Sequence, residues 1–161
     1  MKALRNLFTK NCMMIGAPIE GKLVSINEVS DPTFGEEIIG KGAAIIPSAN
    51  QVYAPVNGKV ATIFPTGHAI ALVADDGEEI LIHIGLDTVK LNGEHFTIHV
   101  QEEQAVKKGD LLLEADIEKI KAAGYDVITP IVVCNSDEYA QIQAEKSGNV
   151  KPGDDILRLQ K

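Results

Sequence analysis

Turn-forming residues interrupt this chain so often that few segments are long enough for a helix. Fourteen glycines and seven prolines separate short apolar runs such as those at residues 22–26 and 80–84. Runs of this length between turn-forming residues are typical of β-strands. Helical patterns occur only at residues 2–8 and 116–123. The sequence therefore predicts an all-β fold with at most short helices.

Two short motifs each occur twice. The sequence APIEGKL at residues 17–23 is echoed by APVNGKV at 54–60, and VKKGD at 106–110 is echoed by VKPGD at 150–154. Two copies are too few for a solenoid, so these strand–turn–strand units favour a folded-over antiparallel β-sandwich or barrel. The length of 161 residues without a linker segment predicts one domain.

Charge and hydropathy limit the classes of partner. The formal net charge of −8 argues against a nucleic-acid partner, because basic patches supply most of that affinity. No apolar stretch approaches the roughly 20 residues of a membrane-spanning helix, and residues 1–10 lack the apolar core of a secretory signal. We therefore expect a cytoplasmic protein. Cys12 and Cys134 fit no metal or redox spacing, so we expect reduced thiols.

Two histidines flank the strongest hairpin signal in the chain. Asp76-Gly77 lies between two strand-like runs, with His68 in the first and His83 in the second. A two-residue loop would place His83 opposite Ile70, on the same face as His68. A four-residue loop would make the two histidines direct partners. Both registers predict two rings on one face, whereas an odd loop without a bulge would separate them.

A histidine pair on one face is suited to metal binding, to acid–base catalysis, or to carrying a phosphoryl group on a ring nitrogen. A metal site needs further ligands, and His95 and His99 lie four residues apart in another strand-like run. Spacing alone leaves these alternatives open. It also leaves open the simpler interpretation that each histidine is a polar strand residue.

A longer motif includes the second histidine. Residues 77–89, GEEILIHIGLDTV, resemble the active-site signature of the glucose-type enzyme IIA proteins of the bacterial phosphoenolpyruvate-dependent sugar phosphotransferase system. Residues 64–69, FPTGHA, resemble the second histidine motif of this family. Shorter motifs follow in the family's order: Ala17-Pro18 with Gly21, Asp31-Pro32-Thr33-Phe34, Gly40-Lys41-Gly42, Ala54-Pro55-Val56, Leu91-Asn92-Gly93-Glu94 and Thr129-Pro130-Ile131.

The resemblance covers roughly residues 15–160 and implies a β-sandwich of the barrel-sandwich hybrid type. We expect residues 15–161 to form an EIIA type-1 domain and residues 1–14 to form a flexible or amphipathic tail. Residues 1–10 resemble a segment that folds against anionic lipid in some family members. Their apolar area is too small for firm anchoring, so a disordered tail is the default expectation.

The resemblance implies a phosphoryl relay. His83 would accept the phosphoryl group from the phosphohistidine of the carrier protein HPr and pass it to a cysteine of the IIB domain of a membrane sugar transporter. His68 would hydrogen-bond the transferring group, and Thr66 would orient the His68 ring. Such a transfer depends on positioning and charge stabilisation. The resemblance implies no cofactor and no metal, although His68 and His83 are suitable ligands for adventitious zinc.

The resemblance also implies a docking surface around the histidines. Its apolar positions are Phe34, Ile38, Ile39, Phe64, Leu81 and Val89. Asp31 and Asp87 match acidic residues near the site, where they would attract a basic partner. HPr and the IIB domain are the expected partners, and some relatives also bind regulatory target proteins.

Two functions of other classes are kept as alternatives. Residues 106–112 resemble the hairpins of biotinyl and lipoyl carrier domains, which share the folded-over architecture, but the Met-Lys-Met context of their modified lysine is absent. A non-catalytic carrier or regulatory module is therefore one alternative. The other is a metal-dependent hydrolase using His68, His83, His95 and Asp87. Gly67 and His95 depart from the family pattern, and neither His95 nor His99 inherits a role.

Overall fold

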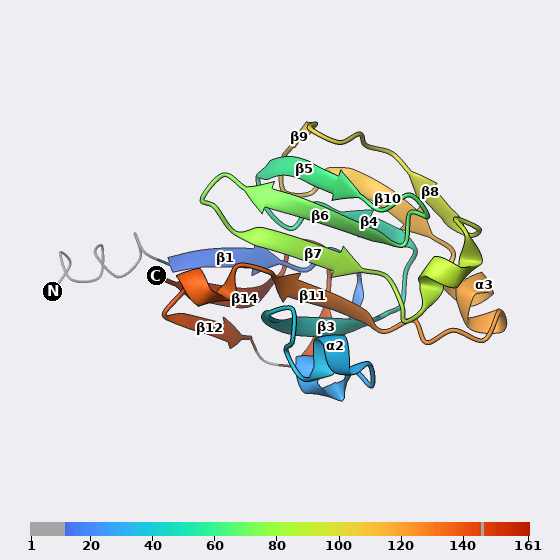
Figure 1. Cartoon of the computed structure of the whole chain (residues 1–161), viewed down its shortest axis with the longest axis horizontal. Coiled ribbons are helices and arrows are strands. Elements are labelled where there is room, and N and C mark those ends of the chain that lie inside the picture. The colour runs from blue at the N-terminus through green and yellow to red at the C-terminus, as the bar shows by residue number, and fades with distance from the viewer. Residues whose placement is uncertain (1–11, 146) are drawn as a thin grey trace, which may run out of the picture.

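The computed structural model describes residues 12–145 and 147–161 and confirms the all-β fold (Figure 1). The expected helical segment at residues 2–8 lies outside the described residues. The segment at 116–123 is confirmed as α3 (Ile117–Ala122), where the side chain of Asp116 accepts a hydrogen bond from the backbone N–H of Lys119. Among the described residues, no helix is long and apolar enough to cross a membrane.

The strands are β1 (Cys12–Gly16), β2 (Gly21–Ser25), β3 (Lys41–Pro47), β4 (Gln51–Tyr53), β5 (Gly58–Ile63), β6 (Ala69–Ala74), β7 (Glu79–His83), β8 (Phe96–Ile98), β9 (Ala105–Val106), β10 (Leu111–Ala115), β11 (Thr129–Val133), β12 (Gln141–Ala144), β13 (Gly148–Val150) and β14 (Asp155–Gln160). The short helical elements besides α3 are α2 (Pro32–Gly35) and the 3-10 turns η1 (Ile26–Glu28), η2 (Thr88–Leu91) and η3 (Ser136–Glu138). All strand pairs are antiparallel within the described residues.

Three sheets enclose one main core. The eight-stranded sheet has the order β13-β2-β3-β11-β7-β6-β5-β9, and Figure 1 shows its strands from β5 to β3 side by side across the front. The sheets β1-β14-β12 and β4-β10-β8 complete the sandwich. Fully buried residues from all three sheets meet in this core, among them Ile15, Ile82 and Leu113. β1 begins at Cys12, so residues 12–14 of the expected tail pair with β14.

The repeated motifs occupy equivalent positions. The backbone N–H of Ala17 donates to the carbonyl of Asp154 at 2.7 Å, and that of Ala54 donates to the carbonyl of Asp110 at 2.8 Å. The glycine before each aspartate donates back to the same alanine, at 2.9 Å in both units. Each motif pair thus closes the fold with the same set of hydrogen bonds, which is the folded-over arrangement predicted from the repeats.

The hairpin between β6 and β7 has neither of the two expected registers. Ala69 faces His83, and the backbone N–H of Ala74 donates to the carbonyl of Glu78 at 2.8 Å. Residues 75–77 therefore form the loop, and Gly77 closes it with a φ of +104°. The predicted two-residue and four-residue loops are wrong. An odd loop places residues 68 and 83 on opposite faces if both follow strand alternation.

A second, smaller cluster lies on the outer face of the eight-stranded sheet. Alternation along β7 directs Ile80 and Ile82 into the main core, and it directs Leu81 and His83 outward. The buried residues of the second cluster are Val24, Ile26, Val29, Phe34, Ala44, Leu86, Ile128 and Val132. This cluster packs α2 against the sheet, and its residue Phe34 contacts the ring of His83.

Candidate functional site

His68 and His83 lie against each other, with ring centroids 5.0 Å apart and ring planes at 80°. Their predicted proximity is therefore confirmed, but its predicted cause is wrong. His83 ends β7 on the outer face, whereas His68 lies in the loop that connects β5 to β6. Gly67 in that loop has a φ of +71°, so the chain turns just before His68. His68 precedes the regular strand, so alternation does not fix the direction of its ring.

The ring of His83 is held by a backbone carbonyl. Its Nδ1 lies 2.7 Å from the carbonyl oxygen of Gly85. A carbonyl oxygen can only accept, so Nδ1 carries the proton of the neutral ring and Nε2 keeps its lone pair. The ring of Phe34 packs on the imidazole with a centroid distance of 4.9 Å. One nitrogen of His83 is thereby engaged, and the other is available as a nucleophile.

His68 is almost fully buried, with an exposed fraction of 4% for the residue. Its Nδ1 lies 2.5 Å from the hydroxyl oxygen of Thr66. The ring of Phe64 packs edge-on against the imidazole, with ring centroids 5.5 Å apart. When the Thr66 hydroxyl donates to Nδ1, the ring proton is on Nε2. Burial, together with the neighbouring His83, lowers the pKa of His68 from 6.5 to about 4.

Burial is also the main cause that lowers the pKa of His83 below its ordinary value. Three groups oppose this effect in part: the Gly85 carbonyl that accepts the Nδ1 proton, and the carboxylates of Asp31 and Asp87. The net direction is downward, so His83 is neutral at neutral pH. A neutral imidazole is the nucleophilic form of this side chain.

The residues predicted to form the docking surface differ in exposure. Ile38 and Val89 are the solvent-exposed apolar residues among them, with exposed fractions of 67% and 48%. Phe64, Ile39 and Leu81 are partly buried. Phe34 is only 4% exposed, so it supports the His83 ring from the second cluster.

The two predicted acidic residues occupy different positions near His83. The side chain of Asp31 caps α2 by accepting from the backbone N–H of Thr33 at 3.0 Å. Asp87 is exposed and adopts a left-handed backbone with a φ of 59°. Both carboxylates raise the pKa of His83, which indicates that they act on the same site.

The loop after His83 is held by groups that the sequence motifs do not single out. The hydroxyl of Thr88 donates to the carbonyl of Ile84 at 2.6 Å, and Thr88 is fully buried. Gly85 has a φ of +77°, and a Cβ there would lie 2.7 Å from Cγ2 of Thr88. The glycine two residues after the histidine was a signal for this arrangement, because it marks a position where the backbone must turn closely.

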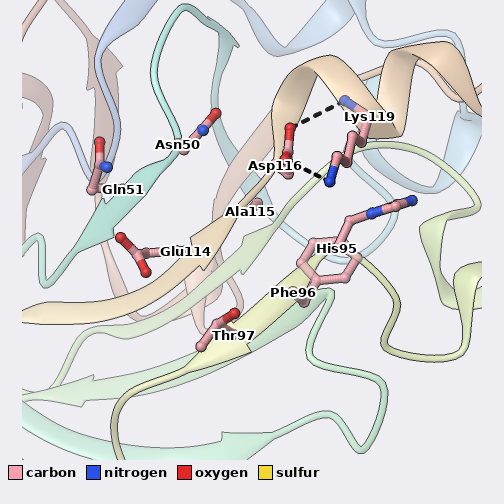
Figure 2. Close-up of a pocket in the computed structure, with 9 residues that line it drawn as sticks. All are labelled: Asn50, Gln51, His95, Phe96, Thr97, Glu114, Ala115, Asp116 and Lys119. Atoms are coloured by element: carbon pink, nitrogen blue, oxygen red, sulfur yellow. Dashed lines mark hydrogen bonds and ion pairs between the residues drawn. The ribbon is translucent and has the colours of Figure 1, made fainter.

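The other two histidines have separate surroundings. Nε2 of His99 lies 3.1 Å from a carboxylate oxygen of Glu114. His95 lines a polar cleft of about 330 Å³ between β4, β8, β10 and α3 (Figure 2). Within residues 12–145 and 147–161, no group of three or more histidine, cysteine, aspartate or glutamate side chains is placed to hold a metal ion.

Several polar groups of this cleft have structural partners. Asn50 accepts a hydrogen bond from the backbone N–H of Ile117, and Asp116 caps α3. Figure 2 shows Asp116 joined to Lys119, whose Nζ lies 3.9 Å from the carboxylate. These contacts fix the start of α3 against β4 and β10. The histidine pair is therefore the better candidate for chemistry.

The low pKa of His68 predicts a specific dependence of stability on pH. The unfolded chain binds a proton near pH 6.5 and the folded chain only near pH 4, so falling pH favours the unfolded state. The stability tied to neutral His68 is present above pH 6.5 and is lost between about 6.5 and 4. The loss approaches about 3 kcal/mol at 1.36 kcal/mol for each pKa unit. Urea denaturation at a series of pH values measures it.

His68→Gln is the matched variant for this measurement, because glutamine does not titrate. Its free energy of unfolding should fall less than that of the wild type between pH 6.5 and 4. Equal pH dependence in the two proteins would show that the folded chain does not depress the pKa of His68.

Comparison with known proteins identifies relatives over most of the chain. Residues 13–139 match the family model described as phosphoenolpyruvate-dependent sugar phosphotransferase system, EIIA 1. A β-glucoside-specific EIIBCA component from Bacillus subtilis (strain 168) is 49% identical over 146 residues, covering 91% of this chain and 24% of that protein. Its counterpart from Dickeya chrysanthemi is 46% identical over 143 residues, covering 89% and 23%. The chain thus spans less than a quarter of these curated relatives.

A solved structure agrees with these matches. Glucose permease IIA from Mycoplasma capricolum has a TM-score of 0.87 and 37% identity, over 94% of this chain and 97% of that chain. The resemblance seen in residues 64–69 and 77–89 is therefore confirmed, as is the β-sandwich fold. The chain belongs to the EIIA 1 family of the phosphoenolpyruvate-dependent sugar phosphotransferase system and is a phosphotransferase component of sugar transport.

Proposed function

We propose that Nε2 of His83 carries the phosphoryl group, accepting it from phosphorylated HPr and donating it to a cysteine of a transporter IIB domain. The observation that supports this role is the hydrogen bond from Nδ1 of His83 to the Gly85 carbonyl, which leaves Nε2 as the nitrogen with a free lone pair. His68 lies directly beside that ring. The transfer takes place on the cytoplasmic side of the membrane.

The accepting step requires no proton transfer. The Nε2 lone pair of His83 attacks the phosphorus held on the HPr histidine, and the bond from phosphorus to the HPr nitrogen breaks with its electron pair left on HPr. The His83 ring then carries a positive charge and keeps its proton on Nδ1. The Gly85 carbonyl and the carboxylates of Asp31 and Asp87 stabilise that charge, because each favours the cationic ring.

The donating step reverses this change. A cysteine thiolate of the IIB domain attacks the phosphorus, and the bond to Nε2 of His83 breaks. The electron pair returns to Nε2, so the ring leaves as a neutral imidazole with its proton still on Nδ1. The hydrogen bond to Gly85 holds the same proton in both steps. His83 therefore acts as acceptor and donor without changing its tautomer.

His68 stabilises the transferring group. Its pKa of about 4 keeps the ring neutral, so it acts as a hydrogen-bond donor and adds no full charge. With the Thr66 hydroxyl donating to Nδ1, the Nε2–H of His68 is free to donate to a phosphoryl oxygen. Thr66 and Phe64 both fix this ring, which reduces the reorganisation needed during transfer.

The names of the relatives support a proposal for the sugar class. The Bacillus subtilis and Dickeya chrysanthemi proteins are described as β-glucoside-specific EIIBCA components. We expect this chain to serve a transporter of β-glucosides, at 46–49% identity to those proteins. The IIA protein of the solved structure belongs to a glucose permease and is 37% identical. Transfer to a β-glucoside IIB domain and to a glucose IIB domain, measured side by side, separates the two classes.

Phosphorylation of the purified protein tests the role of His83. After incubation with phosphoenolpyruvate, enzyme I and HPr, the wild type should gain one acid-labile phosphoryl group and His83→Ala should gain none. His68→Ala should gain the group but donate it to the IIB domain at least about tenfold more slowly, because a stabilising donor is lost. Intact-mass spectrometry measures each product.

His99→Ala is the matched control, since His99 is an exposed histidine bound to Glu114. It should accept and donate as the wild type does. An acid-labile phosphoryl group on His83→Ala would contradict the assignment of His83. No gain on the wild type, with HPr that phosphorylates another acceptor, would contradict the whole relay.

A second prediction concerns docking of HPr. Ile38 is an exposed apolar side chain in the segment that follows α2, close in sequence to Phe34, which contacts His83. Ile38→Asp should raise the KM for phosphorylated HPr about tenfold, because an apolar contact is replaced by a charge at the interface. Steady-state phosphorylation kinetics measure the change, and kcat should change little.

Val73→Asp is the control for Ile38→Asp. Val73 is an exposed apolar residue near the other end of β6, next to the loop at 75–77. Its substitution adds the same charge away from the histidine pair and should leave the KM unchanged. Equal increases in KM for both variants would show that net charge, and not contact at Ile38, controls the association.

A further inference from the structure

One peptide unit links the His83 ring to a neighbouring segment. The carbonyl of Gly85 accepts from Nδ1 of His83 at 2.7 Å. The N–H of the same peptide unit belongs to Leu86, and it donates to the carbonyl of Asp126 at 2.9 Å. The orientation of this peptide therefore determines whether His83 has an acceptor for its Nδ1 proton. Hydrogen bonds in such a chain also polarise and strengthen one another.

Thr88 fixes the preceding peptide unit. Its hydroxyl donates to the carbonyl of Ile84 at 2.6 Å, and the side chain is fully buried. Its methyl group also lies close to Gly85, since a Cβ at residue 85 would be 2.7 Å from it. The Thr88 side chain thus contacts the loop on the His83 side by a hydrogen bond and by packing.

We infer that Thr88 is a positioning residue, which holds the Gly85 carbonyl in place against Nδ1 of His83 and thereby keeps Nε2 unprotonated for phosphoryl transfer. The inference rests on the proposed function of His83. Without the bond from Thr88, the bond from Leu86 to Asp126 remains to hold this loop, and Gly85 has no side chain to restrict its backbone, so the Gly85 carbonyl can shift away from Nδ1. The ring proton can then move to Nε2, and that tautomer has no lone pair with which Nε2 can attack phosphorus.

A buried hydroxyl that satisfies a backbone carbonyl has two separable effects. Removing it leaves the carbonyl of Ile84 without this partner, which destabilises the fold in general. It also releases the loop that carries the Gly85 carbonyl, which changes the tautomer of one ring. A structural role alone predicts the first effect, whereas the positioning role predicts both.

The experiment compares Thr88→Val and Thr88→Ser. Valine keeps the shape of threonine and removes the hydroxyl, and serine keeps the hydroxyl and removes the methyl group. Nitrogen-15 NMR of the ring nitrogens measures the tautomer of His83 in the unphosphorylated protein. Thr88→Val should show a substantial fraction of the Nε2–H tautomer, and Thr88→Ser should match the wild type.

Kinetics with phosphorylated HPr provide a second readout. Thr88→Val should lower kcat about tenfold with little change in KM, because the reactive nitrogen is lost from part of the population and the docking surface is intact. Thr88→Ser should restore most of the rate. If Thr88→Val does not fold, Thr88→Ala is used in its place, because it removes the same hydroxyl and has a smaller side chain.

Ser136→Ala is the control. The hydroxyl of Ser136 also donates to a backbone carbonyl, that of Val133, which pairs with Ile80 near the start of β7 and away from His83. Its loss should lower stability without changing the tautomer of His83. A wild-type tautomer and rate in Thr88→Val would overturn the inference, as would the same tautomer change in Ser136→Ala. If the wild type accepts no phosphoryl group, the proposed function fails, whereas the tautomer comparison still decides the role of Thr88.

Discussion

The hydrogen bond between Nδ1 of His83 and the Gly85 carbonyl determines which ring nitrogen is free, and the surrounding structure serves to maintain it. Its acceptor belongs to a loop that turns through the left-handed φ of Gly85 and is tied to the segment at Asp126. The ring itself is supported by Phe34 of α2. A side chain on a strand end would otherwise sample both tautomers. The hydrogen bond to the backbone thus selects which ring nitrogen of His83 can react.

The two histidine rings lie side by side, but different kinds of structure place them there. His83 is fixed by strand alternation on the outer face of the sheet, and His68 is placed by the loop that turns at Gly67. The neutral state of both rings follows from burial, which lowers both pKa values. Both rings are thus neutral before transfer, and under the proposed function the carboxylates of Asp31 and Asp87 stabilise the positive charge that develops on His83.

The fold class and the folded-over arrangement of the repeated motifs could be predicted, because turn residues and repeats are local signals. The match of residues 13–139 to the EIIA 1 family leaves no need for the carrier and hydrolase alternatives. The hairpin register could not be predicted, since Asp76-Gly77 fits loops of two, three or four residues and the choice depends on packing. Gly85 signals a close turn after His83, but the hydrogen bonds of Thr88 and His83 could not be predicted, because their acceptors are backbone carbonyls.

The position of the phosphoryl group on the ring tests the central claim most directly. Nitrogen-15 and phosphorus-31 NMR of the phosphorylated protein identifies the ring nitrogen of His83 that is bonded to phosphorus. The hydrogen bond from Nδ1 to Gly85 predicts phosphorus on Nε2, with the proton retained on Nδ1. Phosphorus on Nδ1 would contradict the claim, because the carbonyl of Gly85 would then have lost its donor before the reaction.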